Sequence, residues 1–314
     1  MTKLPAPVTR RTVPLALLAA VAGSLLLAAG ASADIFTPDA GGSPNADKID
    51  SLYKLVGVMA IAVFLAVEGV LFWSLIKYKA RKGQVAAQIH GNTKLEIGWT
   101  VGAAVILVFI TAVTFVQLNG IKNPASSDID ANGQQKAGFG AALFASTDQP
   151  DPPGGDALTI KVDGQQYVWR FQYPGPKRVF AYTEMVVPVG RTVVLDITSD
   201  DVAHSWWIPE LGGKQDAIPG YTNQTWFKAT EPGEFGGQCA ELCGRNHANM
   251  IARVRAVPFG EYQQWYDKQA ADIQAAQEEG ARQRRELVES EGGQAAEGGS
   301  GGSAGGASAA DQGN

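Results

Sequence analysis

Two long apolar stretches constrain the fold of this chain more than any other feature. The first runs from Leu55 to Ile76 and the second from Ile97 to Leu118, and each is long enough to cross a bilayer core as a helix. The loop between them carries basic side chains, namely Lys77, Lys79, Arg81, Lys82 and Lys94. Because short basic loops stay in the cytoplasm, we predict a transmembrane hairpin over residues 53–118 with both ends on the outer side.

The N-terminus predicts export. Three basic residues, Lys3, Arg10 and Arg11, precede an apolar stretch, and Ala31-Ser32-Ala33 follows that stretch. This order is typical of a secretory signal peptide, so we assign residues 1–33 to the peptide and 34–52 to an exported segment. An uncleaved membrane anchor is the alternative.

Composition divides the chain beyond the hairpin. Residues 119–156 are rich in Gly, Pro, Ser and Asp, which predicts a linker. Residues 259–288 are rich in Gln, Ala, Glu and Arg, which predicts an exposed helical extension. Residues 289–314 contain no aromatic residue and much Gly, Ser and Ala, which predicts a disordered tail because little surface can be buried.

Residues 157–258 have the pattern of a β-domain. The runs LTIKVDG, YVWRFQYPG, MVVPVG and TVVLDITS alternate apolar with polar residues and are separated by Gly and Pro. β-branched and aromatic residues with this period predict short strands. One compact β-sandwich is the expected fold.

A cluster of soft metal ligands lies late in this domain. Cys239, Cys243, His247 and Met250 share the run QCAELCGRNHANM, and His204 lies upstream in DVAHSWW. Two thiolates, two imidazoles and a thioether suit copper better than magnesium or calcium. These are the only two cysteines in the 314 residues.

The second cysteine favours a binuclear site over a mononuclear one. A single blue-copper site needs one Cys, two His and an axial Met, whereas two thiolates can bridge a pair of coppers with one His on each. Two alternatives remain open. The cysteines could form a local disulfide, or Cys2His2 could hold a structural zinc ion.

These motifs resemble a known family. The Cys-x-Glu-x-Cys-x3-His-x2-Met order, the DVAHSWW box and KQDAIPGYTNQT are similar to the CuA loop region of subunit II of cytochrome c oxidase, a haem-copper terminal oxidase. The resemblance extends over about residues 48–268. It implies that the sandwich is a Greek-key cupredoxin that holds copper.

The resemblance also implies roles for single residues. The copper ligands would be His204, Cys239, the Glu241 backbone carbonyl, Cys243, His247 and Met250. The Glu241 carboxylate would reach a magnesium ion shared with subunit I. Glu96 would stand at the entrance of a proton channel, and Trp99 three residues later supports that match.

Electron entry is expected near the run GQQYVW. The resemblance assigns entry and donor docking to Tyr167, Trp169 and Asp201. The aromatic residues Tyr167, Trp169 and Trp206 could instead be core residues of the sandwich. The chain departs from the better-known oxidases here, with Tyr167 in place of Trp, Val168 in place of an aromatic and Gln172 in place of an acid. Fewer acids predict weaker electrostatic steering of a basic donor.

The predicted function is that of an electron-entry subunit of an oxidoreductase. It would take electrons from a cytochrome c and pass them to haem in subunit I, where oxygen reduction and proton translocation occur; the chain itself would hold no haem and no catalytic residue. Expected partners are subunits I and III, cytochrome c and the plasma membrane, with the copper domain outside and no nucleic acid.

Three rival functions are less consistent with the sequence. A quinol oxidase subunit II would lack the copper ligands, and a nitrous oxide reductase would need more than the three histidines present. A copper chaperone for the same site would have a single crossing.

Overall fold

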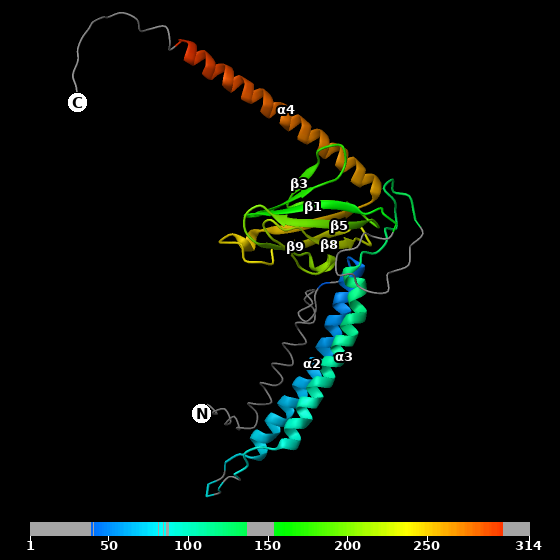
Figure 1. The fold of residues 1–314 in the computed structure, drawn as a ribbon, viewed down its shortest axis with the longest axis vertical. Helices are drawn as coiled ribbons and strands as arrows, with labels where there is room; N and C mark the ends of the chain where they lie inside the picture. The colour runs from blue at the N-terminus through cyan, green and yellow to red at the C-terminus, as the bar shows by residue number, and fades with distance from the viewer. Residues whose placement is uncertain are drawn as a thin grey trace, which may run out of the picture.

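The computed structural model describes residue 39 and residues 41–80, 82–83, 85, 88–136 and 154–297 (Figure 1). The predicted signal peptide lies outside the described residues, as do the last residues of the predicted tail. Within the described residues, two helices, a β-domain and a further helix follow one another.

Helices α2 (Pro44–Lys77) and α3 (Thr93–Lys122) run side by side as a hairpin (Figure 1). Pro44 begins α2, where its missing N–H costs nothing. The Asn92 side chain caps α3 by accepting a hydrogen bond from the Leu95 N–H. Both helices are long and apolar enough to cross a membrane, and most of their large apolar side chains are exposed. The predicted hairpin is confirmed.

Both helices extend beyond their predicted bounds. The 34 residues of α2 span about 50 Å at about 1.5 Å per residue, which exceeds a bilayer core of about 30 Å. The additional turns of α2 therefore lie outside the bilayer core.

The β-domain is a sandwich of two main sheets. One sheet has the strand order β3-β2-β1-β5-β8 and the other β4-β10-β9, while β6 and β7 form a separate two-stranded ribbon. The bounds are β1 Leu158–Gln165, β2 Val168–Gln172, β3 Phe180–Tyr182, β4 Glu184–Pro188, β5 Thr192–Ser199, β6 His204–Trp206, β7 Gln215–Ala217, β8 Asn223–Lys228, β9 Gly233–Gln238 and β10 Ile251–Val257. β1 pairs in parallel with β5, and β4 with β10; the other pairs are antiparallel.

Apolar alternation builds the core of this sandwich. Leu158, Ile160 and Val162 of β1 are buried, whereas Thr159 and Lys161 between them are exposed. The predicted all-β sandwich is confirmed. Two short helices, η1 (Pro209–Leu211) and η2 (His247–Asn249), lie in the loops after β6 and after β9.

Strand β8 hydrogen-bonds to both membrane helices. The Lys228 N–H donates to Ser43 Oγ at 3.0 Å, and the Asn45 amide donates to the Trp226 carbonyl at 2.8 Å. The Trp226 indole N–H donates to the Ile121 carbonyl in α3 at 2.9 Å. Since Ser43 and Asn45 are buried, these bonds satisfy polar groups and position the domain on the hairpin.

The structure describes residues 119–136 and 154–156 of the predicted linker. Residues 119–122 complete α3, and the segment after it packs on the sandwich. The Thr192 N–H donates to Ser127 Oγ at 3.0 Å, the Thr192 hydroxyl donates to the Ala125 carbonyl at 2.6 Å, and Ile129 is buried.

Helix α4 (Phe259–Glu297) corrects the prediction of an exposed extension that ends at residue 288. Tyr262 and Ile273 are buried, and the rings of Trp265 and Tyr266 lie 5.0 and 6.5 Å from that of Tyr173 in the sandwich. Apolar residues at helical spacing therefore bury its first half. Its second half projects away from the domain (Figure 1).

Candidate metal centre

The cysteine loop is closed at its base by the two strands that flank it. Cys239 follows β9 directly, and its N–H donates to the carbonyl of Met250, the residue before β10, at 2.9 Å. The Ala240 N–H donates to the Ser205 carbonyl in β6 at 2.9 Å. These bonds place the cysteine loop against the strand that carries His204.

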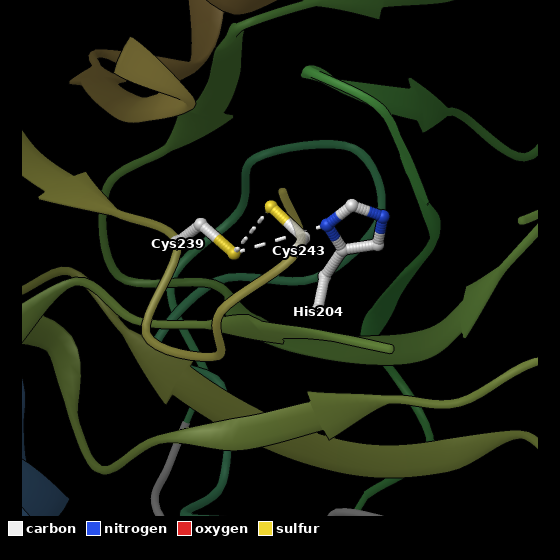
Figure 2. A group of neighbouring side chains, drawn as sticks. All are labelled: His204, Cys239 and Cys243. Atoms are coloured by element: carbon white, nitrogen blue, oxygen red, sulfur yellow. Dashed lines mark hydrogen bonds between the residues drawn. The ribbon is translucent and has the colours of Figure 1, made fainter. Parts of the chain in front are cut away.

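Three buried side chains converge at this end of the sandwich, as Figure 2 shows. The Sγ atoms of Cys239 and Cys243 lie 3.9 Å apart, and His204 Nδ1 lies 3.8 Å from Cys239 Sγ. All three donor atoms lie within 4.8 Å of one another. Both cysteines are free thiols, so the structure has no disulfide between them.

The other predicted metal ligands form two groups, one beside each cysteine sulfur. The Glu241 carbonyl oxygen lies 3.2 Å from Cys239 Sγ, the sulfur that also faces His204. His247 Nδ1 and Met250 Sδ lie 3.5 and 3.9 Å from Cys243 Sγ. Each sulfur thus has two other predicted metal ligands beside it. One is an imidazole nitrogen, and the other is a weaker metal ligand, the Glu241 carbonyl oxygen at Cys239 and the Met250 thioether at Cys243.

Burial disfavours the thiolate form of Cys243 while no cation is bound. Burial, followed by the adjacent Cys239 thiol, raises the pKa of Cys243 to about 11. A bound cation would reverse this preference, because thiols that coordinate metals are deprotonated. The donor set therefore fits a soft metal ion.

Asp201 contacts the outer side of His204. Its Oδ1 lies 2.9 Å from His204 Nε2, the ring nitrogen that faces away from the sulfurs. Burial raises the pKa of Asp201, but hydrogen bonds from His204 and from the N–H groups of Gln166 and Val202 outweigh this effect and lower it overall. The sequence assigned Asp201 to docking and did not indicate this bond.

The aromatic residues expected at electron entry differ in exposure. Trp169 and Trp206 are buried, with ring centroids 5.5 Å apart, and the Trp169 centroid lies 5.8 Å from that of His204. Trp169 is therefore a core residue and cannot itself touch a donor protein. Tyr167 is half-buried, and it lies in the β1–β2 turn beside the cysteine loop: a Cβ on Gly244 would lie 2.5 Å from its hydroxyl.

The remaining predicted site residues lie at exposed positions. Glu96 is in the first turn of α3, and the side chain of Glu241 is exposed although its carbonyl faces the site.

Gln166 is a site residue that the sequence did not indicate. Its side-chain amide donates to the Cys243 carbonyl at 2.6 Å, and its backbone N–H donates to Asp201 Oδ2 at 2.7 Å. One residue of the β1–β2 turn thus connects both ligand-bearing loops. Only its place in GQQYVW, next to the expected entry region, could have drawn attention to it.

A two-helix hairpin that carries a β-sandwich with two loops of soft ligands defines a membrane-anchored, cupredoxin-like protein with a candidate metal centre. Two family models match the chain: the cytochrome c oxidase subunit II transmembrane domain over residues 31–116, and the cytochrome c oxidase subunit II periplasmic domain over residues 175–257. Together they cover more than half of the chain.

Individual relatives agree with the two family models. The chain is 36% identical to cytochrome c oxidase subunit 2 of Alkalihalophilus pseudofirmus over 76% of its own length and 64% of that protein's. It is 33% identical to the Synechocystis protein of the same name over 71% and 73% of the two lengths. The crystal structure of the periplasmic domain of subunit II of the Bradyrhizobium japonicum cytochrome oxidase matches at 38% identity over 37% of this chain and 94% of that one, with a TM-score of 0.36. The chain belongs to the cytochrome c oxidase subunit II family.

Proposed function

We propose that this chain is the electron-entry subunit of a cytochrome c oxidase and holds a binuclear copper centre. The proposed ligands are His204, Cys239, the Glu241 carbonyl, Cys243, His247 and Met250. The observation that carries the proposal is the division of these donors into two similar halves, one around each sulfur. When bound, two coppers that share thiolate ligands supply one-electron exchange with little change in geometry.

The residues around the site support a role in electron transfer more than a role in making or breaking the bonds of a substrate. His204, Cys239, Cys243 and Met250 are all buried, which excludes water from most of the site. A structural zinc site would use two Cys and two His and would leave the buried thioether of Met250 without a role. Electrons would come from a cytochrome c and pass to haem in subunit I, where oxygen is reduced.

Other roles of the chain follow from the family and remain proposals. The exposed Glu241 side chain is available to a magnesium ion at the boundary with subunit I, and the exposed Glu96 could admit protons to subunit I. Association with subunit III is proposed on the same ground. The basic loop between α2 and α3 supports an orientation with the β-domain on the outer face of the plasma membrane.

Electron uptake tests the proposed function. The copper-loaded full chain in detergent should oxidise reduced cytochrome c in a stopped-flow experiment. Cys239→Ser, which removes one proposed bridging sulfur, should abolish this oxidation. Equal oxidation rates for the wild-type and variant chains would contradict electron entry through this site.

A further inference from the structure

The buried imidazole of His204 is held from two sides. Its Nδ1 faces Cys239 Sγ at 3.8 Å, and its Nε2 lies 2.9 Å from Asp201 Oδ1. We propose that Asp201 is a positioning residue that keeps the proton of His204 on Nε2 and thereby leaves the Nδ1 lone pair for the metal. This inference rests on the proposed function of the site.

The surroundings of Asp201 determine which atom donates in this bond. The Val202 N–H donates to Oδ1 at 2.6 Å, and the Gln166 N–H donates to Oδ2 at 2.7 Å. Backbone N–H groups can only donate, so both carboxylate oxygens serve as acceptors. As an ionised carboxylate, Asp201 offers only acceptor atoms to His204 Nε2, which places the proton of a neutral imidazole on Nε2 and leaves Nδ1 as the acceptor nitrogen.

Packing confines the imidazole of His204. A Cβ added to Gly164 of β1 would lie 2.9 Å from His204 Cδ2, so the β1 backbone passes directly beside the ring. The ring centroid of Trp169 lies 5.8 Å away on the same strand pair, and His204 is fully buried. Because packing helps to hold the imidazole ring in place, the main effect of the hydrogen bond to Asp201 is to select the tautomer of His204.

The same carboxylate connects the two ligand loops. Gln166 bonds to Asp201 through its N–H and to the Cys243 carbonyl through its side chain. The loss of the Asp201 carboxylate should therefore weaken the hold on His204 and on the cysteine loop together. Removal of an outer hydrogen-bond partner of a metal-bound histidine typically lowers metal affinity by about 10- to 100-fold.

Asp200 provides a matched control for the docking role that the sequence assigned to Asp201. It is the adjacent residue, its side chain is 55% exposed, and it accepts a hydrogen bond from Gln165 Nε2 at 2.6 Å. Asp200→Asn removes the same negative charge from the same loop without touching His204. A docking role predicts that neither substitution changes the copper affinity, whereas positioning predicts a loss of copper affinity at Asp201 alone.

The test compares Asp201→Asn, Asp201→Ala and Asp200→Asn in the full chain in detergent. We expect copper affinity, measured by competition with a chelator, to fall about 10-fold in Asp201→Asn, which keeps one carbonyl oxygen, and up to about 100-fold in Asp201→Ala. Asp200→Asn should bind copper as the wild type does. Copper affinities of both Asp201 variants equal to that of Asp200→Asn would overturn the proposal, and Asp201→Asn decides alone if Asp201→Ala does not fold.

A second readout needs no metal. With three histidines in the sequence, ¹⁵N-histidine NMR of the copper-free chain can identify the tautomer of each. The wild-type chain should show His204 protonated on Nε2, and Asp201→Ala should lose this preference. A wild-type His204 protonated on Nδ1 refutes the positioning role even if copper binds; failure of the wild type to bind copper refutes the proposed function instead.

Discussion

Gly237 lies where strand β9 passes very close to the chain that leaves β6, beside the candidate metal centre. It lies in β9, two residues before Cys239, and a Cβ there would overlap the carbonyl oxygen of Trp207 and lie 2.9 Å from its carbonyl carbon. That carbonyl accepts the Gln238 N–H at 3.1 Å. Only glycine allows this contact between the strand leading to the cysteines and the chain leaving β6.

Substitution at Gly237 should therefore destabilise the domain. Gly237→Ala forces Trp207 or β9 to move, and we expect a loss of about 2 kcal/mol or more in the free energy of unfolding. Gly236→Ala is the matched control, because nothing lies within 4 Å of a Cβ at that position. Chemical unfolding of the full chain in detergent, followed by tryptophan fluorescence, would measure both. Equal stability of the two variants would contradict this close approach.

Asp163 predicts a pH dependence of stability. Burial, followed by its interaction with Asp200, raises the pKa of Asp163 from 3.8 to about 6, although Arg170 donates to it at 2.8 Å. At pH values between 3.8 and about 6, Asp163 is therefore protonated more often in the folded chain than in the unfolded chain. The contribution of Asp163 to stability is therefore present at low pH and is lost as pH rises through about 6.

Asp163→Asn should remove this contribution. As pH rises from about 4 to about 7, the unfolding free energy of the wild type should fall by about 1 kcal/mol relative to that of the variant. This figure allows for solvent screening. Chemical unfolding of the copper-free full chain at several pH values provides the measurement. A difference that stays constant across this range would show that Asp163 titrates alike in the folded and unfolded chains.

At the scale of elements, the orientation of the α2–α3 hairpin can be tested by labelling. The native cysteines are buried, and Val85 in the loop between the helices is 91% exposed. A membrane-impermeant maleimide should label Glu231→Cys, in the β8–β9 turn, on intact spheroplasts. It should label Val85→Cys only after permeabilisation, and the unsubstituted chain gives the background. The reverse pattern would invert the proposed topology.

Elements with one dominant periodic signal could be predicted from the sequence. The two spans follow from apolar length, and β1 follows from alternation. The packing of α4 could not be predicted in this way, because its Tyr262, Trp265 and Tyr266 lie among polar residues in the sequence. The rings of Trp265 and Tyr266 pack near Tyr173, which follows β2 and is far away along the chain. Likewise, only the folded chain brings Asn45 to strand β8.

At the scale of the whole molecule, the donor types of the site were predictable but their supports were not. Softness and spacing of Cys239, Cys243, His247 and Met250 indicate a metal from the sequence alone. The support from Gln166 joins residues 35 and 77 positions apart, and it depends on two loops meeting at one end of the sandwich. Local patterns carry no information about such pairs.

The central claim is that the site of Cys239 and Cys243 would hold two copper ions that share one unpaired electron. Electron paramagnetic resonance combined with copper counting on the copper-loaded full chain tests it most directly. We predict two copper ions per chain and a hyperfine pattern from one electron shared over two equivalent nuclei, which Cys239→Ser should abolish. A single copper with a mononuclear pattern, or zinc in place of copper, would contradict the claim.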